Sequence, residues 1–277
     1  MISAALIVKN EEAVLRDCLE SIKDHVSEIV IVDTGSTDDT VAIAKEYTDK
    51  VYTFLWIDDF AAARNFALDK TKGDWILSID ADETLITPPT IPAGNHKCAN
   101  VTLTSKGHSH KYPRLLRKGT RWTGKIHEVP DATTNVDSGA VIEYGYSPAH
   151  KLDPDRNLRI LEKAIETDNT PRYKYYLGNE YFERKDYDKA ITTYHQYLKD
   201  AWWHPEIADA HLRLAYCCWW TQEGSYARKH CIEAIGYNPD FKEALLLMAE
   251  MTYEPISSKW RQIAERAQST DVLFTRV

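Results

Sequence analysis

The sequence predicts an α/β domain with a mainly parallel, Rossmann-like sheet, followed by a domain built only of helices. Short β-rich runs alternate with helical patterns over the first half of the chain. After Asp153-Pro154 every pattern is helical. Alternation of this kind is typical of parallel strands joined by helical crossovers. We therefore expect one domain at residues 1–152 and a second at residues 153–277.

In the first domain, apolar runs predict strands and amphipathic runs predict helices. Ile29–Val32 and Trp75–Ile79 are almost continuously apolar, as in strands that are covered on both faces. The expected order is strand Ala4–Val8, helix Glu12–His25, strand Glu28–Val32, helix Asp38–Tyr47, strand Lys50–Phe54, helix Phe60–Lys70 and strand Trp75–Ile79. An irregular antiparallel extension is expected to follow, with strands at Ala99–Leu103, Tyr112–Arg117 and Ala140–Tyr146.

The second domain contains a repeat. Its expected helices lie near Asp155–Thr167, Arg172–Lys185, Tyr187–Lys199, Glu206–Thr221, Tyr226–Tyr237 and Phe241–Thr252. Leu177-Gly178, Tyr181, Ala190 and Tyr194 recur as Leu214-Ala215, Cys218, Ala227 and Cys231, an offset of 37 residues. This pattern resembles tetratricopeptide repeats, whose helix pairs stack and form a concave surface. For Trp202, Trp203, Trp219 and Trp220 we expect core or inter-domain packing, with acceptor binding as the alternative.

Composition limits the partners. A net charge of −8 gives no general attraction to nucleic acid. A basic stretch still allows a nucleic-acid partner. That stretch comprises Lys106, Lys111, Arg114, Arg117, Lys118 and Arg121. Five cysteines without a CxxC pair indicate a reducing, cytoplasmic setting. No basic leader and no apolar run of roughly 18 residues is present, so we expect a soluble, unprocessed protein without a membrane partner.

Polar and acidic residues follow three of the expected parallel strands. Asn10 and Glu11 follow the first strand, Asp33 follows the second, and Asp80-Ala81-Asp82-Glu83 follows the buried strand Trp75–Ile79. Ligands of open α/β sheets bind at the carboxyl ends of the strands. Asp80 and Asp82 have the oxygen ligands that Mg²⁺ and Mn²⁺ prefer. The alternative for the segment after Asp33 is a structural turn that only caps the next helix.

Several motifs together resemble one enzyme family. They are Ile7–Glu11, Ile31–Asp38, Asp58–Asn65, Gly73–Leu77 with Asp80–Glu83, Arg114–Arg117 and Trp122–Glu128. In this order they resemble glycosyltransferase family 2, enzymes of the GT-A fold, and in particular the SunS-like branch with a tetratricopeptide-like tail. The resemblance covers nearly the whole chain.

The resemblance implies an inverting glycosyltransferase that uses a nucleotide sugar, a UDP-sugar first of all, with Mn²⁺ or Mg²⁺. It implies donor binding by Asn10, Glu11, Asp33, Arg64, Asp80, Ala81, Asp82, His127 and Lys151. For the metal it implies Asp82 and Asp80, with His127, His150 or Glu143 as a further ligand. Glu128 is the first choice for the general base, beside Asp82 and an apolar wall at Trp122.

Alternatives remain at three points. Arg64 fits a structural ion pair as well as a ligand contact, and His150 and Lys151 fit a solvated linker. The tail favours a peptide or protein acceptor, whereas the basic stretch would suit a modified nucleobase in DNA. A different class of function is a binding module, in which the repeats recruit a partner and the glycosyltransferase domain is inactive.

Overall fold

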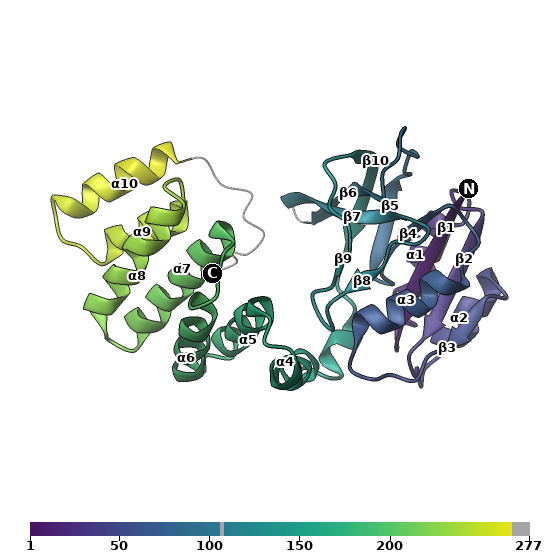
Figure 1. The fold of residues 1–277 in the computed structure, drawn as a ribbon, viewed down its shortest axis with the longest axis horizontal. Helices are drawn as coiled ribbons and strands as arrows, with labels where there is room; N and C mark the ends of the chain where they lie inside the picture. Colours follow the sequence, from purple (N-terminus) through teal and green to yellow (C-terminus); the bar gives the residue numbers. More distant parts are fainter. Residues whose placement is uncertain (106–107, 268–277) are drawn as a thin grey trace. The chain divides into compact units, whose positions relative to one another are not determined.

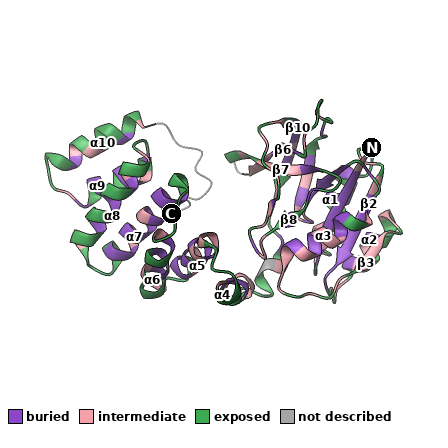
Figure 2. Cartoon of the chain, in the orientation of Figure 1, coloured by how far each residue is buried: buried purple, intermediate pink, exposed green. Residues whose placement is uncertain are grey.

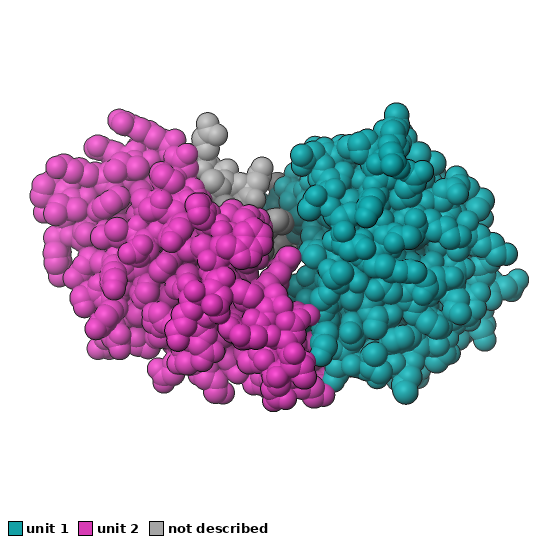
Figure 3. All heavy atoms as spheres, viewed as in Figure 1, with its two compact units in different colours: residues 1–155 teal, residues 156–277 magenta. Residues whose placement is uncertain are grey.

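The computed structural model describes residues 1–105 and 108–267, without the side chain of His150. Lys106, in the basic stretch, therefore lies outside the described residues. The chain divides into two compact units, Met1–Asp155 and Arg156–Val277 (Figure 3). We expected the boundary after Leu152, which is three residues before the boundary in the structure, after Asp155. Among the described residues, no helix is long and apolar enough to cross a bilayer.

A mixed sheet forms the centre of the first unit (Figure 1). Within residues 1–105 and 108–155 its eight strands lie in the order β3-β2-β1-β4-β7-β6-β10-β5. Strands β1 (Ile2–Val8), β2 (Glu28–Asp33), β3 (Val51–Thr53) and β4 (Trp75–Ser78) are parallel. The remaining strands are β5 (Glu83–Thr87), β6 (Cys98–Ser105), β7 (His108–Arg117) and β10 (Asp137–Tyr144). β7 runs antiparallel to β4 and to β6, as expected, but β10 runs parallel to β6, so the extension is mixed rather than antiparallel.

Three helices cover the parallel strands. α1 (Leu15–Ile22) and α2 (Thr40–Tyr47) pack on the face that carries Leu6, Ile31 and Leu77. α3 (Phe60–Lys70) packs on the opposite face, against Val32 and Ile76. Because side chains alternate between the faces of a strand, continuous apolar runs fill both cores. The α/β prediction is confirmed, and α1 begins later than expected because the residues from Glu11 form a turn.

The sequence did not predict three short strands of the first unit. β5 is an edge strand of the main sheet, antiparallel to β10. β8 (Trp122–Thr123) and β9 (Val129–Pro130) pair as a small second sheet. Two-residue strands carry no detectable period of alternation, so pattern analysis cannot find them. The β8–β9 pair matters because it places the segment between Trp122 and Glu128.

The second unit is helical throughout its described part, residues 156–267. Its helices are α4 (Arg156–Thr167), α5 (Pro171–Glu183), α6 (Tyr187–Leu198), α7 (His204–Trp220), α8 (Gly224–Tyr237), α9 (Lys242–Glu250) and α10 (Ile256–Arg266). Buried residues line the faces that the helices turn toward one another (Figure 2). The all-helical prediction is confirmed, and α10 adds a helix that it did not include. Gly178 shows why the repeat needs a small residue, because a Cβ there would lie 2.5 Å from Cε1 of Tyr194.

The four tryptophans, for which core or inter-domain packing was expected, do not lie in the core of this unit. Trp202 is 80% exposed, Trp203 38%, Trp219 38% and Trp220 46%. Two of them precede α7 and two end it, beyond the buried stretch of that helix. At this end, the ring of Trp220 packs only partly, 5.2 Å from the ring of Tyr187. The unit therefore carries large aromatic side chains on its surface.

Candidate active site

The loops after β1 and β2 interlock at the carboxyl edge of the sheet. Val8 and Asp33 end neighbouring strands and are register partners. The Asn10 side chain accepts a hydrogen bond from the Thr37 amide at 2.8 Å, and the Ser36 hydroxyl accepts one from the Asn10 amide at 2.9 Å. Asp33 in turn accepts a hydrogen bond from the Ser36 amide at 3.0 Å. Asn10 and Asp33 thus lie close together in the structure, as predicted.

The segment after β10 contacts two of these loops. The Ser147 hydroxyl donates a hydrogen bond to the Glu11 carboxylate, and the Gly145 amide donates to the Asp82 carbonyl at 2.9 Å. A Cβ at Gly145 would lie 3.1 Å from that carbonyl, so the close approach favours glycine. The following 3₁₀ helix, Pro148–Lys151, contains two of the predicted cationic residues. Lys151 is exposed and lies 5.9 Å from the Tyr146 ring centroid, and the His150 side chain lies outside the described residues.

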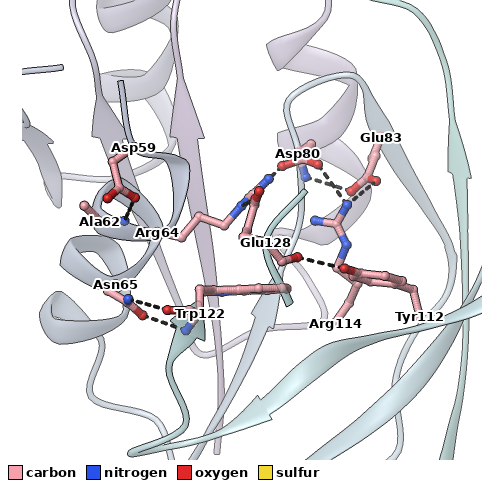
Figure 4. A network of polar contacts seen from close by, with 10 residues as sticks. All are labelled: Asp59, Ala62, Arg64, Asn65, Asp80, Glu83, Tyr112, Arg114, Trp122 and Glu128. Carbon is pink, nitrogen blue, oxygen red and sulfur yellow. Dashed lines mark hydrogen bonds and ion pairs between the residues drawn. The ribbon is translucent and has the colours of Figure 1, made fainter. Parts of the chain in front are cut away.

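Asp80 lies at the centre of a polar network on the same edge (Figure 4). One carboxylate oxygen lies 2.8 Å from Nη1 of Arg64, and the other lies 2.9 Å from Nη2 of Arg114. Burial alone would raise the pKa of Asp80, but Arg114 and Arg64 outweigh it and hold that pKa below its usual range. Arg64 therefore makes the ion pair with Asp80 that was one of its predicted alternatives. Asp80 is ionised and bound on both oxygens.

Glu83 completes this network from the first position of β5. Its carboxylate lies 3.3 Å from Nη2 of Arg114 and accepts a hydrogen bond from the Asp80 amide at 2.8 Å. Burial and the negative charge of Asp80 raise the pKa of Glu83 to about 7, although Arg114 opposes the shift. Arg114 and Glu83 were not singled out as site residues. The sequence did contain a signal for Arg114, because it lies next to apolar residues in an expected strand. A buried arginine almost always has a charged partner.

The segment between β8 and β9 attaches to α3. Trp122 and Asn65 exchange two hydrogen bonds of 2.9 Å, and Arg64 donates from Nε to the Glu128 carboxylate. The Tyr112 hydroxyl donates to the Glu128 carbonyl at 2.8 Å. Trp122 is 3% exposed, and its ring centroid lies 5.6 Å from the Arg64 guanidinium. Trp122 thus supports Arg64 from the core, and little of its ring is open to a ligand.

The remaining predicted residues lie at the periphery. Asp82 is half-buried in the turn before β5, and Ala81 beside it is 4% exposed. His127 is exposed and has a positive φ of 53°. Glu143, the alternative metal ligand, is exposed on β10. The structure thus gathers Arg64, Asp80 and Glu128 and leaves His127 at the edge.

A divalent ion can be tested against this donor set. Among the described residues, no three His, Cys, Asp or Glu side chains are grouped as metal ligands. Both oxygens of Asp80 are paired with arginines, and the convergence of Asp80 and Asp82 on one cation stays a prediction. Mg²⁺ commonly binds one or two carboxylates and completes its shell with water and substrate phosphates. Asp82 with a diphosphate ligand fits that requirement.

Comparison with known proteins identifies the domain that carries this edge. Residues 3–91 match the family model of glycosyl transferase family 2. The first unit contains a glycosyltransferase family 2 domain. The match includes the loops of Asn10, Asp33 and Asp82, so the predicted resemblance is confirmed.

Curated relatives also resemble parts of this chain. A TPR repeat-containing protein of Synechococcus elongatus is 51% identical over 85 residues, covering 31% of this chain and 21% of that protein. The glycosyltransferase SunS of Bacillus subtilis is 27% identical over 205 residues, covering 65% and 49%. The lipopolysaccharide core biosynthesis glycosyltransferase LpsC of Rhizobium meliloti is 41% identical over 168 residues, covering 59% and 51%. The matches span about half or less of these relatives.

Two solved structures resemble separate parts of the chain. MamA is 18% identical with a TM-score of 0.38, covering 43% of this chain and 72% of that one. Glucosyl-3-phosphoglycerate synthase from Mycobacterium tuberculosis, in complex with Mg²⁺ and UDP, is 29% identical with a TM-score of 0.28. That similarity covers 30% of this chain and 34% of the synthase.

Proposed function

We propose that this protein is an inverting, metal-dependent glycosyltransferase that takes a sugar from a nucleotide sugar, with a UDP-sugar as the first candidate. The observation that carries the proposal is the edge at which Asn10, Asp33 and Asp80 follow three neighbouring parallel strands within a family 2 domain. Polar groups at a single carboxyl edge suit a ligand that lies across several strands. The Arg64 and Arg114 guanidinium groups order this edge before a ligand arrives.

Each group has a defined task in the proposed reaction. Asn10, Glu11 and Asp33 hydrogen-bond the base and ribose, and the Ala81 side chain packs in the core beneath this edge. Mn²⁺ or Mg²⁺ on Asp82 would stabilise the leaving diphosphate. Lys151 supplies a positive charge near the phosphates. His127 and His150 are candidate contacts to the metal or the phosphates.

Glu128 is the proposed general base. In an inverting transfer, the acceptor attacks the anomeric carbon from the face opposite the departing diphosphate, and a carboxylate takes its proton. The ion pair with Arg64 fixes the orientation of the Glu128 carboxylate. Trp122 contributes through packing, because its ring lies against Arg64.

The acceptor is proposed to be a peptide or protein held by the repeat unit. Aromatic side chains are enriched at protein interfaces, and Trp202 and Trp220 are exposed there. The basic stretch gives weaker support to a DNA acceptor, because several of its members have acidic or polar partners. Lys111 pairs with Asp137, Arg121 pairs with Asp69, and Arg117 binds Asn95, while Arg114 lies within the network.

The decisive experiment measures donor binding and turnover. Calorimetry with UDP and a panel of UDP-sugars, with and without Mn²⁺, is expected to show metal-dependent binding. Asp82→Asn is expected to lower donor turnover by about 10²-fold or more, because it weakens the metal that stabilises the leaving group. Asp74→Asn is the matched control, since Asp74 is exposed at the opposite end of β4 and should leave turnover unchanged.

Two results would point to other functions. If no nucleotide sugar binds with or without divalent metal, the binding-module alternative is favoured. If pyrophosphate is released from a nucleoside triphosphate, the reaction is nucleotidyl transfer instead. Full metal-independent activity in Asp82→Asn would refute the assigned metal position.

A further inference from the structure

Three histidines from consecutive helices of the second unit face one another. His195 lies on α6, His211 on α7 and His230 on α8, and α7 packs against both neighbouring helices (Figure 1). The ring centroids of His211 and His230 lie 5.3 Å apart, and those of His195 and His230 lie 5.4 Å apart. The Nδ1 atoms of His211 and His230 approach to 3.0 Å. None of the three belongs to the proposed active site, so the cluster needs its own explanation.

We propose that His211 and His230 bind one transition-metal ion, Zn²⁺ first of all, through their Nδ1 atoms, and that His195 turns to supply a third ligand. Imidazole nitrogen suits Zn²⁺, Ni²⁺ and Cu²⁺, whereas Mg²⁺ and Mn²⁺ prefer oxygen ligands. This site would therefore take a different class of metal from the ion proposed for sugar transfer. The inference goes beyond the proposed function, because it gives the repeat unit a metal of its own.

The distance between the two nitrogens matches that of two ligands on one ion. With Zn–N bonds of about 2.0–2.1 Å, ligand nitrogens lie about 3.3 Å apart in a tetrahedral site and about 2.9 Å apart where two ligands meet at a right angle. The observed 3.0 Å lies between these values. Two rings on one tetrahedral ion have centroids about 5 Å apart. Both centroid distances in the cluster are close to that value.

The protons of the pair are compatible with a metal. In the 3.0 Å contact, the Nδ1 atom of one neutral ring donates a hydrogen and the Nδ1 atom of the other accepts it. When an ion binds both Nδ1 atoms, the donor ring carries its hydrogen on Nε2 instead, so both rings stay neutral. The positive charge of Lys229 faces the same rings and opposes a cation. Affinity therefore depends on the imidazole ligands rather than on the local charge.

His195 lies on the open side of the cluster. Its side chain is exposed, His211 is half-buried and His230 is 7% exposed. Within residues 1–105 and 108–267 no three potential ligands already surround one point, so His195 must change rotamer to complete the site. Exposed side chains change rotamer rapidly. An ion that joins α6, α7 and α8 would stabilise the folded repeats, because it binds the folded state in preference to the unfolded one.

The test uses the full chain without a histidine tag, freed of metal by a chelator, and Co²⁺ as a spectroscopic substitute for Zn²⁺. The wild type is expected to bind a single Co²⁺ ion with the visible absorption of a tetrahedral site, and Zn²⁺ should displace it. Loss of a residue that only supports a ligand weakens metal affinity by roughly 10–100-fold. Loss of the ligand itself in His211→Gln or His230→Gln should therefore weaken it by about 100-fold, and His195→Gln by about tenfold. His25→Gln, at an exposed position of the first unit, is the control and should keep the wild-type affinity.

Folding is measured beside metal binding. Helical circular dichroism shows whether each variant is folded, and Zn²⁺ should raise the thermal midpoint of the wild type but not that of folded His230→Gln. If His211→Gln and His230→Gln do not fold, His195→Gln decides the test, because its position is exposed, and wild-type affinity in that variant would overturn the three-histidine site. The inference also fails if the wild type binds no Co²⁺, if the folded variants bind it equally well, or if a thiolate absorption band shows that a cysteine is the ligand.

Discussion

Arg64 and Glu128, which are 64 residues apart in the sequence, form a buried ion pair beside the carboxyl edge of the sheet. Their side chains are 10% and 11% exposed. Arg64 comes from α3 and Glu128 from the segment before β9, so the pair joins one helix to the small second sheet. Because Arg64 also binds Asp80, the orientation of Glu128 depends on the same cation as the proposed donor site.

Glu128→Gln separates a chemical role from a structural one. Glutamine keeps the shape and a hydrogen-bond acceptor for Arg64 but cannot take a proton. As a general base, Glu128 should contribute about 10²–10⁴-fold to kcat, with UDP affinity nearly unchanged. Single-turnover transfer and UDP calorimetry measure the two quantities. Glu46→Gln, at an exposed position on α2, is the control. A kcat close to wild type in Glu128→Gln would exclude the base assignment.

Glu83 is expected to make the stability of the first unit depend on pH. Burial and Asp80 raise its pKa from 4.5 to about 7 in the folded protein. A carboxyl group with a raised folded pKa contributes its full stability below pH 4.5 and loses it as the pH rises through 7. The loss amounts to about 3 kcal/mol, at roughly 1.4 kcal/mol per pKa unit.

Glu83→Gln should remove this dependence. Its free energy of unfolding relative to the wild type is expected to rise between pH 5 and pH 8, by up to about 3 kcal/mol. Urea unfolding at the two pH values, followed by a signal of the first unit, provides the measurement. A difference between variant and wild type that stays constant with pH would show that Glu83 titrates normally.

The parallel half of the fold was predictable because its signals are local. Apolar runs covered on both faces, and small or acidic residues at their carboxyl ends, mark β1, β2 and β4 in the sequence itself. Asn10 and Asp33 could be placed together for the same reason, since parallel neighbours end at one edge. The helical tail could be predicted as well, because its sequence contains a repeat.

Apart from the ion pair of Arg64 with Asp80, the charge network was not predictable, because it depends on the order of strands that are distant in sequence. Arg114 reaches Asp80 only because β7 inserts antiparallel beside β4. Sequence alone offered Asp80 as a metal ligand next to Asp82, and nothing local shows that two guanidinium groups already occupy it. Likewise Ser147 reaches Glu11 from 136 residues away. Such contacts follow from topology rather than from motif spacing.

A pair of histidines in the repeat unit predicts acid sensitivity. His211 and His230 approach to 3.0 Å between their Nδ1 atoms, and this contact requires at least one neutral ring. Burial lowers the pKa of both to about 4, and the other charges that face them, from His195 and Lys229, act in the same direction. A depressed pKa gives stability above pH 6.5 that is lost as the pH falls through 4.

His230→Gln should reduce that loss. For His230, which is 7% exposed, the wild type is expected to lose about 3 kcal/mol between pH 7 and pH 4. The helical circular-dichroism signal in urea follows the repeat unit at each pH. His25→Gln, at an exposed site in the first unit, should leave the acid transition of the repeats unchanged. Equal acid sensitivity in His230→Gln and wild type would contradict the prediction.

Two glycines in the repeat unit should respond oppositely to alanine. At Gly178 a Cβ would lie 2.5 Å from the buried Tyr194 ring, so Gly178→Ala is expected to destabilise the unit by about 1–3 kcal/mol through overpacking. At Gly236, an exposed helical position, a Cβ meets nothing within 4 Å, and Gly236→Ala should stabilise it by about 1 kcal/mol.

The pair at positions 178 and 194 also explains the repeat pattern. In the next repeat the matching positions hold Ala215 and Cys231, which are buried in one cluster. Alanine is larger than Gly178 and cysteine is smaller than Tyr194, so the two changes in size offset each other. Gly178→Ala combined with Tyr194→Leu should therefore recover part of the stability lost in Gly178→Ala alone. Urea midpoints of the four proteins test this coupling. Additive effects would show that the two positions do not share one packing volume.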